Sequence, residues 1–487
     1  MPRRSLLALV SLLILFPAQS SASPPVGGTA SHQSKVQAAI QSTVDPRVEL
    51  LSIVARLAGY EEYQTHANPA YEKDIHAHFD RHANHPLIAY TRRIRQTHGI
   101  SHDAVMSMAV SLTPPPELAP RLPLSALGTP RWNKEISEQF IKLLKDFYQT
   151  ARCEDFFKGQ ASRYKHAEAT LPALFSSFDT DWYSRFYGDR TPKNFHIILG
   201  LGNQAHSYGI KQETPDEPES IYAIMGIHRL DAAGNYILAP ATATSEETRL
   251  LVHEFNHSFI NPAIAKHEKL LAPAGKALLA EAAPLMPPTY RSWQTVLNES
   301  LVRAAVIRYM IAHQSDKTQI DAEMNRQVAE GFIWLPEIVD FLETYENNRK
   351  QYPRFEDIIP LLPDTLNNAT ATMARYPKVI SLGEFENGNL EVSPGLAQIT
   401  IRFSKPMNPA AGISIYCGTQ GMSHFPPMDM AASSYSPDGK SFTMKWKKGE
   451  KLKPHFDYSF LLKGERFQSR DGYPLMNYPV SFRTSQQ

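Results

Sequence analysis

The chain has 487 residues, of which 42% are hydrophobic, so it is long enough to bury a large core and to carry a second module. Its 50 lysines and arginines balance 49 aspartates and glutamates, which leaves a net charge of +1. A chain with so little net charge has no basic field for nucleic acid and no acidic field for cationic partners, and we exclude a nucleic-acid role.

The first 22 residues have the features of a secretory signal peptide. A basic start, residues 1–4, precedes an apolar core at residues 6–16 and the small residues Ser20, Ser21 and Ala22. The core is shorter than the about 20 residues that span a membrane, and no cysteine follows it as a lipid attachment point. We therefore expect cleavage after Ala22 and a secreted or periplasmic protein of a bacterium, without a membrane span.

The elements predicted next are mainly helical. Residues 23–39 are rich in Pro, Gly and Ser and are predicted to be flexible. Helical apolar spacing then covers residues 47–60, 85–98, 103–112 and 135–157. Residues 195–199 and 220–226 read as strands of a small mixed sheet. Residues 203–208 are expected near the edge strand, where an extended substrate would pair through its main chain.

Two further helices carry the chemistry. The first runs from a capping box at residues 244–247 to a stop signal at Asn261-Pro262. The second, strongly apolar, is predicted over residues 293–312, and more helices follow as far as residue 346.

The composition changes after residue 352, where a Pro-rich segment precedes a β-patterned region. Short alternating runs typical of strands lie at residues 397–403, 413–416, 441–446, 458–462 and 480–484. Their spacing predicts a β-sandwich. We predict two domains, at residues 40–370 and 377–487.

The most informative motif is His253-Glu254-Phe255-Asn256-His257. Residues i and i+4 of a helix lie on one face, so both imidazoles can reach one metal ion. This HExxH pattern is that of zinc proteases, in which the glutamate is the general base that takes a proton from water. It predicts one Zn²⁺ per chain, bound by His253 and His257, with Glu254 as the catalytic base. The alternative is a buried helix whose histidines only form hydrogen bonds.

A catalytic zinc normally takes three protein ligands and leaves one position for water. The spacing HExxHxxGxxH is excluded, because Ile260 and Ala263 stand where Gly and His are required. Glu299 is the best candidate, since a charge in so apolar a helix needs a partner. An ion pair with Arg303 is its alternative role. The alternative ligands are Glu281, Glu268 and His267.

Peptide hydrolysis also needs a donor that stabilises the oxyanion, usually Tyr or His. Tyr290 and Tyr309 are the candidates by their closeness to Glu299 in the sequence, although such residues are more often packed aromatics. His206 and His228 receive no ligand role. The two cysteines, Cys153 and Cys417, cannot build a disulfide scaffold, and two buried free thiols are favoured over an interdomain bridge.

Residues 251–262, Leu-Val-His-Glu-Phe-Asn-His-Ser-Phe-Ile-Asn-Pro, resemble the central motif of a bacterial family of secreted zincin-like proteins, the domain-of-unknown-function family 4932. Residues 44–51, the Asn298-Glu299 helix and residues 330–353 agree with that family, so the similarity covers residues 40–365. It implies a gluzincin-like zinc metallopeptidase with His253, His257 and Glu299 as ligands and Glu254 as base.

The C-terminal region carries a second resemblance. Residues 399–409, 452–458 and 481–484 are similar to a bacterial Ig-like domain of the S-layer type, over residues 377–487. Such modules space, anchor or bind, and this one is expected to contact the cell envelope or another protein. The expected fold class is α+β: a mainly helical zincin-like metallopeptidase domain with a small mixed sheet, followed by an all-β Ig-like sandwich.

The leading hypothesis is therefore a secreted zinc metallopeptidase that hydrolyses a peptide or protein substrate. The alternative is a non-enzymatic envelope or surface binding protein with a degenerate zincin domain and an Ig-like binding module. A third hypothesis is a metal hydrolase that acts on a non-peptide bond. An intact HExxH motif argues against the binding protein, whereas a closed site with four protein ligands would favour it.

Overall fold

The computed structural model describes residues 40–124, 131–172, 178–191, 193–213, 218–231, 234–237, 242–283, 286, 290–418, 420–464 and 466–486. The expected signal peptide and flexible segment, residues 1–39, lie outside the described residues. The described part is mixed α and β with small sheets, which confirms the α+β class at that level. None of its helices is both long and apolar enough to cross a membrane.

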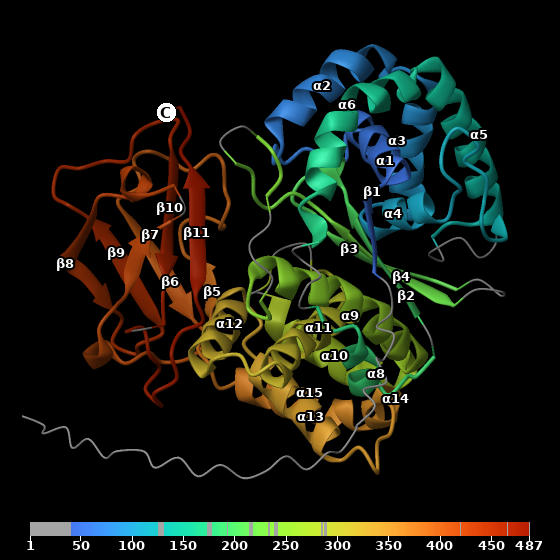
Figure 1. Ribbon diagram of the computed structural model, residues 1–487. Coiled ribbons are helices and arrows are strands. Elements are labelled where there is room, and N and C mark those ends of the chain that lie inside the picture. The colour runs from blue at the N-terminus through green and yellow to red at the C-terminus, as the bar shows by residue number, and fades with distance from the viewer. Residues whose placement is uncertain are drawn as a thin grey trace, which may run out of the picture. The chain divides into compact units, whose positions relative to one another are not determined.

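Six helices form the N-terminal region (Figure 1). They are α1 (Pro46–Leu57), α2 (Pro69–Phe79), α3 (Pro86–His98), α4 (Asp103–Val110), α5 (Lys134–Thr150) and α6 (Cys153–Glu168). α1 starts where the Asp45 side chain accepts from the Arg47 N–H, with Pro46 in the first turn. Residues 47–60, 85–98 and 103–112, predicted as helices, correspond to α1, α3 and α4.

The single helix predicted at residues 135–157 is wrong, because α5 and α6 are separate. Arg152 has a φ of 52°, in the left-handed region, and the chain turns there before α6 begins at Cys153. The apolar spacing is helical on both sides of the turn, so the pattern alone did not show it.

A four-stranded sheet lies between these helices and the later ones (Figure 1). Its order is β1 (Gln41–Val44), β2 (Lys193–Leu199), β4 (Glu219–Met225) and β3 (Tyr208–Gln212). β1 and β4 pair with β2 in parallel, and β3 pairs antiparallel with β4 as an edge strand. The strands predicted at residues 195–199 and 220–226 are confirmed as β2 and β4. Residues 203–208 lead into the edge strand, which begins only at Tyr208.

The remaining helices of this part are α8 (Asp181–Tyr187), α9 (Glu246–Lys266), α10 (Glu268–Ala282), α11 (Trp293–Ala312), α12 (Lys317–Ala329), α13 (Leu335–Asn347), α14 (Phe355–Ile358) and α15 (Leu362–Met373). The Ser245 side chain caps α9 by accepting from the Thr248 N–H. The predicted helix at residues 293–312 is confirmed as α11.

The stop signal at Asn261-Pro262 is wrong, since α9 continues to Lys266 with Pro262 inside it. A proline has a helical φ and removes one backbone hydrogen bond. The next residues, Ala263 and Ile264, are buried in the core, and their burial favours continuing the helix over ending it.

The C-terminal region forms two antiparallel sheets with a core of their own, which includes Ile399, Ile401, Met444, Phe460 and Phe482. One sheet has the order β5 (Val379–Leu382), β6 (Gln398–Phe403), β9 (Ser441–Trp446), β8 (Met428–Tyr435), and the other β11 (Tyr478–Arg483), β10 (Asp457–Leu462), β7 (Ile415–Cys417). The five predicted strands correspond to β6, β7, β9, β10 and β11. The pattern missed β5, which is short, and β8, in which only Met428 is buried.

Candidate metal centre

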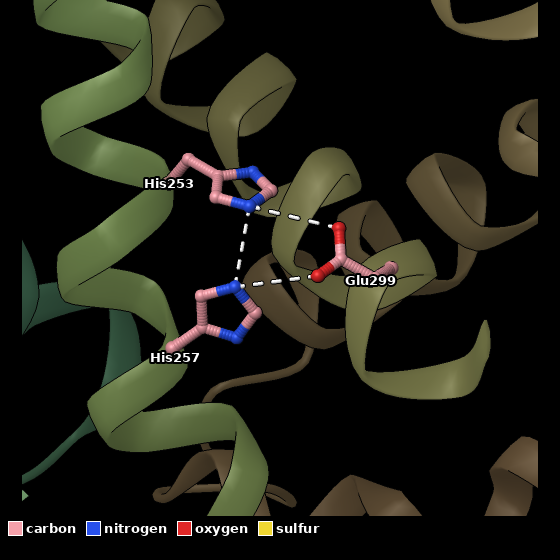
Figure 2. Close-up of side chains that lie close together, drawn as sticks. All are labelled: His253, His257 and Glu299. Carbon is pink, nitrogen blue, oxygen red and sulfur yellow. Dashed lines mark hydrogen bonds and ion pairs between the residues drawn. The ribbon is translucent and has the colours of Figure 1, made fainter. Parts of the chain in front are cut away.

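Two imidazoles and one carboxylate converge from α9 and α11 (Figure 2). The Nε2 atoms of His253 and His257 lie 3.2 Å apart. Glu299 presents Oε2 at 3.6 Å from His253 Nε2 and Oε1 at 3.5 Å from His257 Nε2. All three side chains are partly buried, with 15–18% of each exposed, so they meet in a recess that solvent still reaches.

These three side chains could hold one metal ion. Ligand bonds of about 2.0–2.1 Å in a regular tetrahedron place the ligand atoms about 3.3 Å from one another. The separation of 3.2 Å between the two Nε2 atoms is close to that value. The two distances to Glu299 end on different oxygens, and one donor atom from each of the three side chains lies within 4.8 Å of the others. Among the described residues, no fourth His, Cys, Asp or Glu joins the group.

Asn256, inside the motif, holds α9 against α11. Its side chain is fully buried, and its Nδ2 donates to the Val302 carbonyl of α11 at 3.4 Å. Its Oδ1 accepts from the Tyr187 hydroxyl at 2.9 Å. Because Asn256 lies next to His257 and Val302 lies one turn after Glu299, this contact sets the register between ligands of the two helices.

Arg303 orients Glu299. Its Nε donates to Glu299 Oε2 at 3.3 Å, and its Nη1 donates to Glu330 Oε2 at 2.7 Å. Its guanidinium lies 4.3 Å from the centre of the Phe332 ring. Burial lowers the pKa of Arg303, but the neighbouring Glu299, Tyr290 and Glu330 raise it above its usual value. The ion pair between Arg303 and Glu299 is thus compatible with a ligand role of Glu299, because Arg303 contacts Oε2 and Oε1 faces His257.

The surroundings of the two histidines favour metal binding through Nε2. His257 Nδ1 is 3.2 Å from Asn261 Oδ1, and donation to that oxygen leaves the Nε2 lone pair directed at the cluster. Burial, followed by His257 and Arg303, lowers the pKa of His253 well below its usual value. A neutral imidazole is the form that binds metal.

Glu254 lies on the side of α9 that packs against β3. Its side chain is buried, and burial together with the Glu299 carboxylate raises its pKa well above the usual value. The Gly209 N–H of the edge strand donates to it and opposes that rise. A carboxylate in this setting binds a proton more strongly than one in water, as a general base requires.

Residues 40–363 match the family described as Domain of unknown function (DUF4932). The chain belongs to this family. The whole candidate centre lies inside the DUF4932 region, and no curated protein matches the chain.

Solved structures of S-layer proteins show a distant likeness. The N-terminal part of the bacterial S-layer protein SbsC matches with a TM-score of 0.18 and 11% identity over 51% of this chain and 61% of that one. Domains 1–6 of SbsC match with a TM-score of 0.19 and 13% identity over 52% and 35%. The chain thus spans about three fifths of the length of the first of these structures. Both TM-scores are too low to indicate a shared fold.

The other ligands considered in the DUF4932 region lie outside the cluster. Glu268 Oε1 accepts from Gln294 Nε2 at 3.0 Å, and Glu281 forms an ion pair with Lys378. His267 follows the last residue of α9, ten residues after His257. Of the candidates weighed from sequence, the structure brings Glu299 alone to the two histidines.

The two tyrosines considered as oxyanion donors have different positions. Tyr290 lies beside the centre, where its hydroxyl accepts from Arg303 Nη2 at 3.1 Å. Tyr309 follows Glu299 by ten residues on α11, which is about 15 Å along the helix axis. Its ring is buried and stacks on His313, and its hydroxyl accepts from the Asp179 N–H at 3.3 Å. The proposed role of Tyr309 is therefore corrected: it is a packed core residue.

A polar cavity of about 390 Å³ opens beside His253. Three arginines, Arg249, Arg303 and Arg326, alternate on its wall with glutamates from α9 and α12. His228, to which sequence reasoning assigned no role, also lines it. The sequence offered little indication of this position, because His228 lies in the loop after β4 and the path of that loop depends on how the sheet packs.

The cysteines are free thiols. Cys153 is buried, and burial raises the pKa of its thiol to about 12. Cys417 is half-buried rather than buried. A thiol with so high a pKa is not a nucleophile near neutral pH.

Proposed function

We propose that this protein is a secreted zinc-dependent peptidase with its centre at His253, His257 and Glu299. The observation that carries the proposal is the convergence of two imidazole nitrogens, 3.2 Å apart, with the carboxylate of Glu299. Its Oε2 lies 3.6 Å from His253 Nε2 and its Oε1 lies 3.5 Å from His257 Nε2, and two histidines with one carboxylate are a donor set that suits zinc. Three protein ligands with access to solvent are typical of catalytic zinc, whereas structural zinc is closed by four. Export is proposed from the basic and apolar pattern of residues 1–22.

Each residue has a defined task. His253 and His257 donate neutral Nε2 lone pairs, and Glu299 adds a carboxylate that Arg303 keeps in place. A bound Zn²⁺ supplies Lewis acidity, which acidifies water and polarises a carbonyl. Glu254 takes the proton from the attacking water and passes it to the leaving amine. Tyr290, whose hydroxyl is oriented by Arg303, is the candidate donor to the oxyanion.

The substrate is an extended peptide. β3 is an edge strand, so one of its sides has backbone groups available for an added strand. It packs against α9 at Gly209, beside Glu254, and a peptide added there runs past the centre. The cavity next to His253 then receives one of its side chains.

The test compares zinc content and peptide cleavage in matched variants of the purified protein. The unchanged protein should hold about one zinc per chain by elemental mass spectrometry and cleave members of a quenched fluorescent peptide library. Glu254→Gln should keep the zinc and lose about 10²–10⁴-fold in cleavage rate. Glu299→Ala should lose the zinc.

Glu268→Gln is the control, because Glu268 lies on α10 outside the cluster and should change neither quantity. Full cleavage by Glu254→Gln would refute the mechanism. Full zinc occupancy in Glu299→Ala would remove Glu299 from the ligand set. Tight zinc binding with no cleavage of any peptide would favour the non-enzymatic or non-peptide alternatives.

A further inference from the structure

A groove of about 440 Å³ lies in the C-terminal β region, apart from the residues of the metal centre. Its lining combines apolar residues, which are Met422, Phe425, Pro426, Pro427 and Met428, with polar ones, which are Ser423, Lys447, Glu450, Lys451, Lys453 and Tyr458. Met422 is 71% exposed, which is unusual for so large an apolar side chain.

Hydrogen bonds join the residues of the groove to the neighbouring strands. The Lys447 N–H donates to the Pro427 carbonyl at 2.9 Å and joins one wall to the end of β9. The Lys453 N–H donates to the Tyr458 hydroxyl at 2.8 Å and joins the rim to β10. The His424 ring contacts the Asp457 carbonyl at 2.7 Å through Nδ1 and fixes the short helical turn that carries Met422. The groove is thus part of the fold.

Its rim is basic. Lys447, Lys451 and Lys453 are exposed and face the groove with a single acidic residue, Glu450. Within the part of the chain that the structure describes, none of these three lysines has a carboxylate within 4.0 Å. The Lys453 ammonium lies over the Phe456 ring, 4.8 Å from its centre. Three cations beside one anion complement an acidic ligand.

We propose that this groove binds an acidic polypeptide segment that contains a large apolar side chain. The apolar side chain enters between Met422 and Phe425, and flanking carboxylates pair with Lys447, Lys451 and Lys453. This binding is separate from the proposed hydrolysis and does not depend on it.

The form of the groove favours a polypeptide over other anionic partners. A flat lipid surface does not fill a concave site, and an anionic glycan has no large apolar group to cover Met422, Phe425 and Met428. Strand addition to β8 is also disfavoured, because Asp429 Oδ1 accepts from the N–H groups of Ala431 and Ala432 and occupies part of that strand.

The test measures binding of a labelled peptide, Glu-Glu-Leu-Phe-Glu-Glu, to the full chain by fluorescence anisotropy, with mass spectrometry to verify that the peptide stays intact. We expect a Kd on the order of 10–100 µM at 50 mM salt and about tenfold weaker binding at 500 mM salt. The triple variant Lys447→Gln, Lys451→Gln, Lys453→Gln should weaken binding at least tenfold. Met422→Ser should weaken it about threefold.

The matched control removes the same charge from three other exposed lysines, Lys276, Lys350 and Lys440, and should bind as the unchanged protein does. The peptide Gln-Gln-Leu-Phe-Gln-Gln should not bind. Equal peptide binding by the triple groove variant would overturn the proposal and would point to the cavity beside His253. Lysine-dependent binding of polygalacturonate or of phosphatidylglycerol vesicles without binding of the peptide would also overturn it.

Discussion

A methyl group at Gly209 would lie 2.0 Å from the carbonyl oxygen of Glu254, so the edge strand β3 and helix α9 touch backbone to backbone at the candidate base. The same methyl would be 3.0 Å from His257 Cβ. The Gly209 N–H also donates to the Glu254 carboxylate. A residue without a Cβ is therefore needed for the strand to approach the centre this closely.

Gly209→Ala should force β3 away from α9, because the added methyl meets rigid backbone. We expect a loss of about 1–3 kcal/mol in unfolding free energy, as for other overpacked sites, and at least a tenfold loss of cleavage, since the base and the substrate strand move apart. Urea denaturation and peptide hydrolysis would measure both. Gly159→Ala is the control: nothing lies within 4 Å of its Cβ, and in helix α6 it should stabilise by about 1 kcal/mol. Unchanged cleavage by Gly209→Ala would show that β3 does not position the substrate.

Asn256→Ala should loosen the contact between α9 and α11. The change removes the bond to Val302 and leaves the buried Tyr187 hydroxyl without its acceptor, which should cost about 2 kcal/mol. Zinc affinity should fall about tenfold, as on loss of other residues that orient metal ligands. Competition with a zinc-binding dye would measure it. Tyr187→Phe removes one of the two bonds and should lower stability by about 1 kcal/mol with zinc affinity retained. Equal zinc affinity in Asn256→Ala would exclude its role in setting the register.

Removal of zinc should lower stability, because the ion joins two helices that the unfolded chain does not hold together. At a free zinc concentration 100 times the Kd, the gain in unfolding free energy should be about 2.7 kcal/mol. Thermal unfolding with zinc and with a chelator would measure the difference. In Glu299→Gln the two curves should coincide. If zinc raised the unfolding temperature of Glu299→Gln as much as that of the unchanged protein, the zinc would be bound elsewhere.

Glu49 should make stability depend on pH. It is fully buried in α1 and accepts from the Leu201 N–H at 2.6 Å, the Gly202 N–H at 3.1 Å and the Tyr71 hydroxyl at 2.7 Å. Burial raises its pKa from 4.5 to about 7. The folded state then binds more protons than the unfolded state between these two values, so unfolding free energy falls as pH rises across that window, by about 3 kcal/mol.

Urea denaturation from pH 4.5 to pH 7.5 would measure this dependence at a fixed zinc concentration. Glu49→Gln cannot titrate, so its stability relative to the unchanged protein should rise with pH over the same range. Glu61→Gln, at an exposed position, should keep the original dependence. A constant difference between Glu49→Gln and the unchanged protein would show that Glu49 is ionised throughout.

Several elements followed from local pattern. The helix at residues 293–312 appears with the predicted bounds as α11, because its apolar residues have the helical period and Ser292 caps it. The break between α5 and α6 at Arg152 and the continuation of α9 through Pro262 could not be predicted from local pattern. Each is decided by which side chains find a place in the core, and that choice involves residues far away in the chain.

The candidate metal centre likewise has one part that the sequence predicts and another that only the tertiary structure reveals. Sequence alone determined that His253 and His257 share one helical face, because backbone hydrogen bonds within a single helix set the spacing of residues i and i+4. Only the tertiary structure decided that Glu299, rather than Glu268, Glu281 or His267, lies within reach of them. It also decided that Tyr290 lies at the centre and Tyr309 in the core, and that Gly209 and Asn256 hold the strand and the second helix in place. The contacts of Asn256 with Val302 and of Tyr309 with Asp179 join residues 46 and 130 positions apart, which no local period encodes.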